Sequence, residues 1–424
     1  MARKMKDSGI EWIGEIPEGW EVHRVKTHFS IISGSGFKPE LQGQSTGDFP
    51  VCKASDISSS GHYLHTSANY ITSDIVKSQH FSIIPKGSIL FAKIGEAMRK
   101  NNRSLCSLDC CVDNNCQGLV PKNISSEFSY YLFTCIDMTW FDNAGTIPCI
   151  NNQKLYDCRI PFPSYGEQTL IANHLNIQCA KINEMLFHIR SSIEEYKKLK
   201  QAIITQAVTK GVRGEREMKD SGVEWTGEIP VNWTIQRFAR VAEVKSNLVS
   251  PDNYLEYPQI SPENIEKDSG KLLLPCRTVA EVGVISGNHL FYKGQILYSK
   301  IRPKLNKVCI APFDGLCSAD MYPIESKNDT RYIMYCILSN GFLQQVSMIT
   351  ENRVKMPKIN QVELSKVLVA IPETIAEQKE IADYLDAKCT EIDGLIAKKE
   401  QLVKELEGYK KSLIYEVVTG KREV

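Results

Sequence analysis

Residues 5–20 read MKDSGIEWIGEIPEGW, and residues 218–233 read MKDSGVEWTGEIPVNW, with twelve of the sixteen positions identical. The two copies lie 213 residues apart, which is close to half of the 424-residue chain. Solenoid and propeller repeats are far shorter, at roughly 20–50 residues. A chain of this length forms two or three domains, because single hydrophobic cores stop growing well below this size. The repeat therefore predicts two copies of one folding unit.

The duplication continues in shorter patches along the chain. The matching pairs are KGSILFAKI (86–94) with KGQILYSKI (293–301), the weaker FPVCKASDI (49–57) with YPQISPENI (257–265), TIPCIN (146–151) with KMPKIN (355–360), and EQTLIANHL (167–175) with EQKEIADYL (377–385). The offset between the copies drifts from 213 to 207 and back to 210, so small insertions separate the patches. Each half is therefore predicted to be a variable globular segment held between repeated ends.

Each half ends in a long apolar stripe. Apolar side chains keep a 4-3 spacing over six heptads, which predicts coiled-coil packing rather than an ordinary surface helix. Lys200 interrupts the first stripe, and Lys399 and Lys410 interrupt the second. The stripes consist of Leu175, Cys179, Ile182, Leu186, Ile189, Ile193, Tyr196, Ile203 and Ala207 in the first half, and of Leu385, Cys389, Ile392, Ile396, Val403, Leu406, Leu413 and Val417 in the second.

Each stripe needs a partner, and the other copy has the same length and register. Two similar units most simply pack about a pseudo-two-fold axis, which makes the two helices an antiparallel coiled coil with one globular segment at each end. Parallel packing is an alternative, and so are helices that merely cover separate cores. The globular segments mix short β-rich and helical stretches without regular βαβ alternation, so the predicted fold class is α+β.

The composition and the absence of apolar runs indicate the cellular compartment and, with it, the redox state of the cysteines. The chain is 42% hydrophobic and 24% charged, as is ordinary for globular proteins. No apolar run approaches the roughly 18 residues of a membrane span, and the start lacks the apolar core of a signal peptide. We therefore expect a cytoplasmic protein, most simply of a prokaryote, with its fourteen cysteines as free thiols. The tightest cysteine group, Cys106, Cys110, Cys111 and Cys116, lacks the paired spacing of a zinc site.

The sequence contains no candidate for catalysis. It lacks the phosphate loop G-x-x-x-x-G-K-[ST], the H-E-x-x-H metal motif, and the N-P-P-[YF] tetrapeptide of adenine methyltransferases. SGSGF at residues 33–37 lacks the third glycine of a dinucleotide fingerprint and is predicted to form a turn. We therefore expect no enzyme activity, no cofactor and no bound metal.

Basic and amide residues gather after the matching strands at residues 86–94 and 293–301, with Glu96 as the one acid among them. Arg, Lys and Asn suit phosphate oxygens and base edges in the major groove. A single basic run is usually a solvated loop, and a net charge of +1 is low for a DNA-binding protein. Two runs at equivalent positions nevertheless favour DNA binding, with Arg353, Lys355 and Lys358 as a second choice. The candidate DNA-binding residues are Lys93, Arg99, Lys100, Asn101, Asn102 and Arg103 in the first half, and Lys300, Arg302, Lys304, Asn306 and Lys307 in the second.

Across nearly its whole length, the chain resembles the specificity subunit of a type I restriction–modification system. The resemblance rests on the paired openings, on PFPSYGEQTLIANHL (161–175) and AIPETIAEQKEIADYL (370–385), and on ITQAVTKG (204–211) and IYEVVTGK (414–421). It implies a non-catalytic subunit whose two target recognition domains each read one half of a split double-stranded DNA site. The same resemblance implies two conserved helices that pair antiparallel and fix the gap between the half-sites. Its implied partners are two adenine methyltransferase subunits and restriction subunits with an ATP-dependent motor.

In this interpretation, the recognition domains occupy residues 1–165 and 214–374, and the spacer helices residues 166–213 and 375–424. The three lysines that interrupt the stripes are modest departures, and one interpretation places them at contacts with partners. A duplicated coiled-coil adaptor that holds proteins without DNA is the alternative function. The missing motifs disfavour a chain that is itself a methyltransferase or nuclease.

Overall fold

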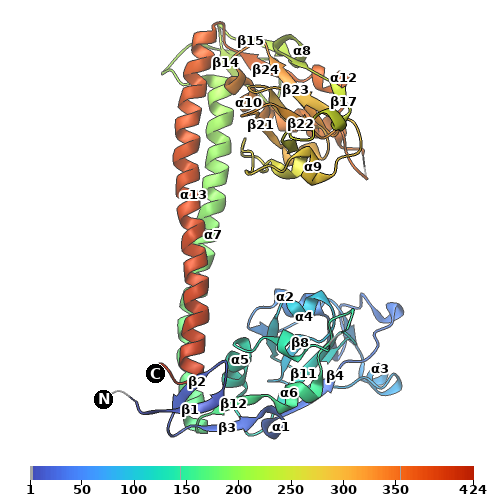
Figure 1. The fold of residues 1–424 in the computed structure, drawn as a ribbon, viewed down its shortest axis with the longest axis vertical. Coiled ribbons are helices and arrows are strands. Elements are labelled where there is room, and N and C mark those ends of the chain that lie inside the picture. The colour runs from blue at the N-terminus through green and yellow to red at the C-terminus, as the bar shows by residue number, and fades with distance from the viewer. Residues whose placement is uncertain (1–2, 144, 354) are drawn as a thin grey trace. The chain divides into compact units, whose positions relative to one another are not determined.

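The chain divides into two compact units. The first comprises the described residues up to position 188 together with 402–424, and the second comprises 189–401. Each unit contains a mixed α+β head and a segment of each of two long helices (Figure 1). The computed structural model describes residues 3–143, 145–353 and 355–424.

The two long helices begin in the same way. Ser164 Oγ accepts a hydrogen bond from the backbone N–H of Glu167 at 3.3 Å, and Thr374 Oγ1 accepts one from the N–H of Glu377 at 3.2 Å. A hydroxyl three residues before a glutamate is a helix-start signature, because it satisfies a backbone donor that has no partner within the helix. The helices are α7 (Tyr165–Lys210) and α13 (Ile375–Val418).

Within each unit, the two helices pair with each other and run antiparallel. In the second unit, Lys399 Nζ lies 5.6 Å from the centroid of the Tyr196 ring, and Lys200 Nζ lies 2.9 Å from Asp393 Oδ1. Rising residue numbers on α7 therefore face falling numbers on α13. Most stripe residues are buried or partly buried, as the coiled-coil spacing predicts.

The interrupting lysines lie within the helix pair, and this corrects the interpretation that places them at contacts with partners. Lys200 binds Asp393, and Lys399 lies over Tyr196. In the first unit, Lys410 Nζ donates to Asn183 Oδ1 at 2.8 Å. The ammonium group of each lysine thus finds a partner on the facing helix.

The first head is built on a five-stranded sheet in the order β4-β11-β8-β9-β6 and a three-stranded sheet in the order β10-β5-β7. Two antiparallel pairs, β1-β2 and β12-β3, accompany these sheets. Its strands are β1 (Met5–Ile10), β2 (Gly14–Pro17), β3 (Glu21–Arg24), β4 (Phe29–Ser33), β5 (Phe49–Cys52), β6 (Tyr63–Leu64), β7 (Tyr70–Ile71), β8 (Ile89–Ala92), β9 (Arg103–Cys106), β10 (Cys111–Val112), β11 (Cys116–Pro121) and β12 (Arg159–Phe162). Its helices are α1 (Val25–His28), η1 (Pro39–Leu41), α2 (Ala54–Ser59), α3 (Ser73–Ser78), α4 (Glu96–Arg99), α5 (Ser126–Thr134), η2 (Met138–Phe141) and α6 (Asn152–Asp157).

The second head repeats this plan with two four-stranded sheets, β16-β23-β20-β21 and β17-β19-β22-β18, and with the pairs β13-β14 and β15-β24. Its strands are β13 (Met218–Asp220), β14 (Glu228–Pro230), β15 (Thr234–Arg237), β16 (Ala242–Val244), β17 (Leu248–Val249), β18 (Gln259–Ile260), β19 (Asn288–Phe291), β20 (Ile296–Ser299), β21 (Val308–Ile310), β22 (Gly315–Cys317), β23 (Met321–Ser326) and β24 (Leu368–Ile371). Its helices are α8 (Phe238–Val241), η3 (Pro251–Asn253), η4 (Pro262–Asn264), α9 (Val279–Val282), η5 (Pro303–Leu305), α10 (Thr330–Leu338), α11 (Asn340–Thr350) and α12 (Gln361–Ser365).

The internal repeat is visible in the strand pairing. β8 lies between β11 and β9, and β20 lies between β23 and β21, antiparallel on both sides in each case. β5 pairs parallel with β10, and β18 pairs parallel with β22. One core in each unit joins the head to both helices, since Phe128 clusters with Leu175 and Val417 in the first unit. The predicted α+β fold with two similar heads and two long antiparallel helices is confirmed, and the helices also cover the cores of the heads.

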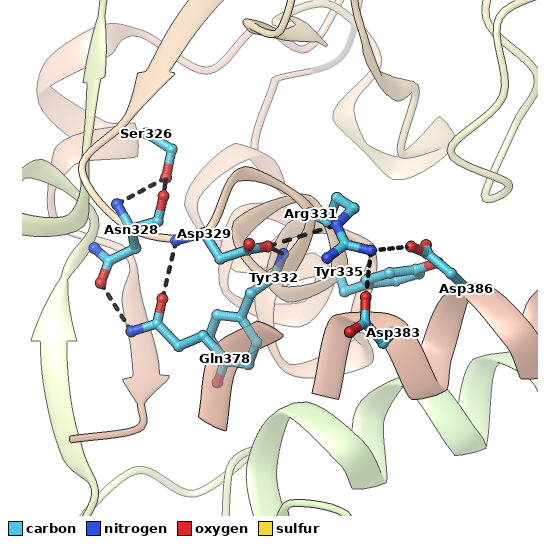
Figure 2. A network of polar contacts seen from close by, with 9 residues as sticks. All are labelled: Ser326, Asn328, Asp329, Arg331, Tyr332, Tyr335, Gln378, Asp383 and Asp386. Atoms are coloured by element: carbon cyan, nitrogen blue, oxygen red, sulfur yellow. Dashed lines mark hydrogen bonds and ion pairs between the residues drawn. The ribbon is translucent and has the colours of Figure 1, made fainter. Parts of the chain in front are cut away.

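A network of polar contacts joins the second head to the start of α13 (Figure 2). The side chain of Gln378 accepts a hydrogen bond from the backbone N–H of Asp329 and donates one to Asn328 Oδ1, both at 3.0 Å. Asp329 Oδ1 in turn accepts from the N–H of Tyr332 at 3.0 Å and caps α10. In the first unit, Gln168 Oε1 accepts from the N–H of Ser125 at 2.8 Å in the same way.

The charged part of this network lies one turn further along α13. Arg331 Nη1 lies 2.7 Å from Asp383 Oδ1 and 2.6 Å from Asp386 Oδ2. Tyr335 donates its hydroxyl hydrogen to the other oxygen of Asp386 at 2.6 Å (Figure 2). These contacts fix the angle between α10 and α13, because they tie two successive turns of α10 to one face of α13.

All fourteen cysteines are free. Burial raises the pKa of the Cys111 thiol to about 11, and it raises the pKa of Cys116 further. These thiols are protonated at neutral pH and therefore poor nucleophiles. Among the described residues, no group of His, Cys, Asp and Glu side chains is arranged to hold a metal ion. No helix in the described part of the chain is both long and apolar enough to cross a membrane.

Candidate nucleic-acid interface

The candidate DNA-binding residues follow the central strand of each head. β8 and β20 are buried at all four positions and are paired on both sides. Their sequences, ILFA and ILYS, are almost continuously apolar, as expected for a strand that is covered on both faces. The loop after such a strand starts from a rigid scaffold, and binding residues commonly lie on loops of this kind.

Both loops enclose a short helix between two residues of positive φ, although their sequences and the ψ angle at the first of these residues differ. In the first head, Gly95 and Asn101 have φ angles of +73° and +61° and enclose the short helix α4. In the second head, Arg302 and Asn306 have φ angles of +46° and +41° and enclose η5. An arginine rarely adopts this left-handed conformation, and strained residues of this kind cluster at functional sites.

A second repeated segment is hydrogen-bonded to each loop. In the first head, Gly95 donates its backbone N–H to the carbonyl of Pro148 at 2.8 Å, and Ile150 donates to the carbonyl of Lys93 at 2.9 Å. The matching bonds of the second head join Arg302 N–H to the carbonyl of Pro357 at 2.8 Å and Ile359 N–H to the carbonyl of Lys300 at 2.9 Å. The repeated patches at 146–151 and 355–360 therefore lie beside the repeated strands, far apart from them in sequence.

Only part of the first basic run is exposed. Lys100 is exposed, and so is Arg99, whose Nη1 lies 2.7 Å from Glu96 Oε1. This spacing of three residues on one helical turn favours the pair, although an exposed pair contributes little energy and can exchange for a phosphate. Lys93 is partly buried, and its carbonyl belongs to the backbone frame.

Arg103 does not reach the surface, which corrects its assignment as a phosphate-binding residue. It is 6% exposed, and its Nη2 donates to the carbonyl of Ile136 and to Asn101 Oδ1, both at 2.7 Å. Burial lowers the pKa of Arg103 to about 10, so the guanidinium stays charged at neutral pH. Asn101 Oδ1 also accepts from the N–H of Met138, and Asn102 donates to Ser58 Oγ, both at 3.0 Å. The hydrogen bonds of these three residues therefore stabilise the loop from its buried side.

In the second basic run, Arg302 and Lys304 are exposed. Lys300 Nζ lies 5.3 Å from the centroid of the Tyr322 ring, and Lys307 Nζ donates to the carbonyl of Pro262 at 2.6 Å. Asn306 is 1% exposed, so it is not available for base contacts in this conformation. Its two side-chain polar atoms have no hydrogen-bond partner within the described residues.

The second-choice surface is largely engaged in ion pairs. Arg353 Nη1 lies 3.1 Å from Glu363 Oε2, and Lys358 Nζ lies 2.9 Å from Asp320 Oδ1. Lys355 is exposed. Sequence reasoning named Lys355 and Lys358 only as part of a second choice and did not include residues 146–151, although the repetition of both segments was a signal that they belong to the common frame.

Comparison with known proteins defines the class to which this duplicated fold belongs. A family model described as "Type I restriction modification DNA specificity domain" matches residues 17–195 and again residues 230–405. These two matches cover more than half of the chain. The chain therefore belongs to the family of type I restriction–modification specificity subunits, and it carries two DNA specificity domains.

Individual relatives agree with this assignment. The chain is 38% identical over 278 residues to the EcoDI specificity subunit of Escherichia coli, and this match covers 62% of each chain, less than two thirds of that subunit. It is 23% identical over 386 residues to the MjaIX specificity subunit of Methanocaldococcus jannaschii, with 86% of each chain covered. A solved chain from work on complex assembly and conformational transition of the type I R-M system matches with a TM-score of 0.66 and 14% identity. That match covers 96% of this chain and 99% of the solved one, and it shows a shared fold.

Proposed function

We propose that this chain is the non-catalytic DNA-reading subunit of a type I restriction–modification complex in the cytoplasm of a prokaryote. Residues 1–165 and 214–374 form two target recognition domains, and each reads one half of a bipartite double-stranded DNA target. Residues 166–213 and 375–424 form the spacer helices that set the gap between the half-sites. The observation that carries the proposal is the pair of equivalent loops, one in each head, that present exposed cations at the end of the central strand.

The chemistry of these loops suits a polyanion. Arg99 and Lys100 in the first head, and Arg302 and Lys304 in the second, are exposed on a frame that backbone hydrogen bonds hold in place. Phosphate contacts depend on the local field and not on the net charge of the chain. The overall charge of +1 is thus compatible with DNA binding, especially in a complex with more basic subunits.

The helices offer matching surfaces for protein partners. Met185 and Leu395, which are 210 positions apart, are 46% and 36% exposed; Leu199 and Tyr409, at the same offset, are 47% and 49% exposed. Each unit thus exposes, among other apolar residues, one member of these pairs on α7 and one on α13. Repeated exposed apolar positions favour two equivalent docking sites, in keeping with two adenine methyltransferase subunits. Methyl transfer and cleavage belong to those subunits and to restriction subunits with an ATP-dependent motor, and this chain contributes no cofactor or metal.

The proposal can be tested by exchanging the second variable segment, residues 234–374, for that of a relative within the complete complex. Mapping N6-methyladenine across the host genome should then show one half of the methylated motif changed and the other half kept. Residues inserted in the helix region should change the gap and leave both half-sites readable. A chimera that alters both halves of the methylated motif would contradict independent reading by the two heads. If no methylation of the genome depended on this chain, a role in DNA recognition would be contradicted.

A further inference from the structure

Each head exposes one large apolar side chain at the same position of its frame. Ile147 is 66% exposed in the first head, and Met356 is 49% exposed in the second, at an offset of 209 residues. Each directly precedes the proline whose carbonyl accepts the hydrogen bond from the basic loop. An exposed apolar residue on its own is ordinary, but the same exposure at equivalent positions of two divergent heads requires a common explanation.

The backbone around these side chains is fixed on the side that follows them. Gly95 and Arg302 donate to the carbonyls of Pro148 and Pro357, as described above. A few residues later, Asn151 Oδ1 accepts from the N–H of Gln153, and Asn360 Oδ1 accepts from the N–H of Glu363, both at 2.9 Å. Each asparagine caps a short helix, α6 in the first head and α12 in the second. The segment that follows the exposed residue is therefore already ordered, so binding through this residue costs little further conformational entropy.

The neighbouring charges indicate what these side chains contact. The loop bonded to Ile147's segment carries the exposed Arg99 and Lys100, and the loop bonded to Met356's segment carries Arg302 and Lys304. A protein that docks on an apolar patch is disfavoured by exposed cations on the loop that is bonded to the same segment. Such a side chain suits DNA, because cations bind phosphates while an apolar group contacts a thymine methyl group or a base step.

We infer that Ile147 and Met356 make apolar contacts with the bases of the DNA target, each within the half-site bound by its own head. This inference rests on the proposed function. It assigns base contact to residues that carry no charge and no hydrogen-bond donor, and so complements the charged and amide side chains as readers of the sequence.

The test uses the complete methyltransferase complex and measures affinity for the cognate duplex, for duplexes with either half-site scrambled, and for random duplex. Ile147→Ala and Met356→Ala should each weaken binding to the cognate duplex roughly tenfold, as expected from the removal of a few buried carbon atoms. Each should change binding to random duplex less than twofold and leave the salt dependence unchanged. Scrambling the half-site of the altered head should abolish the difference from the unaltered complex, whereas scrambling the other half-site should preserve it.

A control in each head distinguishes Ile147 and Met356 from exposed apolar residues in general. Ile285, 94% exposed between α9 and β19, and Ile83, 40% exposed in the first head, should bear substitution by alanine without loss of affinity. The inference would be overturned if Ile147→Ala and Met356→Ala both left the affinity for the cognate duplex unchanged while the unaltered complex still bound DNA with normal salt dependence. The proposed function would then still stand. Equal loss on cognate and random duplex would also overturn the inference. An unaltered complex that does not bind DNA would instead overturn the proposed function.

Discussion

In both units, the same pair of positions lies at the contact between α7 and α13, but the side chains there and their interactions differ. In the second unit, Lys200 pairs with Asp393 at 2.9 Å, and their side chains are only 8% and 19% exposed. In the first unit, 210 positions away, Lys410 donates to Asn183, and this pair is open to solvent. The repeat therefore preserves the geometry of the contact, and the surroundings decide whether it is an interior ion pair or a surface hydrogen bond.

The surroundings differ because one head reaches the seam. Lys271, from the segment between η4 and α9, places its Nζ 2.7 Å from Asp393 Oδ2. Asp393 thus binds two lysines, one from α7 and one from the head. A buried ion pair is weak evidence for added stability, but removal of one partner strands the other charge.

Replacing the shared acid should produce the largest effect. Asp393→Leu should destabilise the second unit by about 3 kcal/mol, because Lys200 would be buried without an anion. Asn183→Leu, the matched change, should cost less than about 0.5 kcal/mol in the first unit because that contact is exposed. Hydrogen exchange followed by mass spectrometry can report the two units separately.

The double replacement Lys200→Leu with Asp393→Leu is the control for this prediction. It should recover most of the stability that the single change removes, since an apolar pair of similar size often substitutes for a buried ion pair. Equal destabilisation by Asp393→Leu and Asn183→Leu would show that burial does not distinguish the two contacts between α7 and α13.

The next effect concerns matched tyrosines at the junctions between heads and helices. Tyr335 donates to the carboxylate of Asp386 at 2.6 Å, whereas Tyr131 donates to the amide oxygen of Asn176 at 2.7 Å. Hydrogen bonds to charged acceptors contribute more than neutral ones, so Tyr335→Phe should cost about 2 kcal/mol and Tyr131→Phe about 1 kcal/mol. Denaturant titration of each variant provides the measurement. A larger cost for Tyr131→Phe would mean that packing, and not acceptor charge, decides these contacts.

The two loop frames predict changes of opposite sign at one position. Gly95 has φ +73° and Arg302 has φ +46° at equivalent places. With φ +73° and ψ −164°, Gly95 lies in a region that is essentially restricted to glycine, so Gly95→Ala should destabilise the first head by about 1–3 kcal/mol. The effect would come from backbone strain alone, because the added Cβ would meet no atom within 4 Å. Arg302→Gly should stabilise the second head by up to about 1 kcal/mol, because Arg302, with φ +46° and ψ +54°, lies in the left-handed region that glycine adopts without strain.

Arg302→Ala is the matched control, since it removes the cation and keeps the strained Cβ. Thermal unfolding and DNA affinity should then separate, with both Arg302 variants binding equally weakly and only the glycine variant melting higher. Equal melting temperatures for Arg302→Gly and Arg302→Ala would show that the left-handed backbone costs nothing.

The smallest effect is a dependence on pH in the first unit. Burial alone would raise the pKa of Glu127, but the nearby His62 imidazole and the hydrogen bond from Tyr63 hold it below its ordinary value of 4.5. A lowered folded pKa contributes stability above about pH 4.5 that is lost as the pH falls through the folded value. Glu127→Gln should therefore lower the free energy of unfolding of the first unit by a few tenths of a kcal/mol near neutral pH. The difference should vanish in acid, and a difference that grows as the pH falls would reverse the assigned sign.

The overall fold could be predicted from the sequence because the sequence repeats the folding unit. The paired openings and the seam residues predicted two heads and paired helices, since periodicity and repetition are local signals. The candidate site was only partly accessible. The sequence located both loops, but it could not tell that Arg103 and Asn306 point inward, because their burial depends on residues such as Ile136 that lie far along the chain. For the same reason it placed Lys200, Lys399 and Lys410 at partner contacts and missed their partners on the facing helix.

The most direct test of the account measures the affinity of the complete methyltransferase complex for duplex DNA at several salt concentrations. Alanine at the four exposed loop cations, Arg99, Lys100, Arg302 and Lys304, should reduce the slope of log affinity against log salt by roughly 0.9 for each phosphate that is no longer neutralised. Alanine at the helix-surface cations Lys197 and Lys388, which pair with acids on their own helices, should leave the slope unchanged. A slope and an affinity that stay the same after all four loop substitutions would contradict the claim that these loops bind DNA.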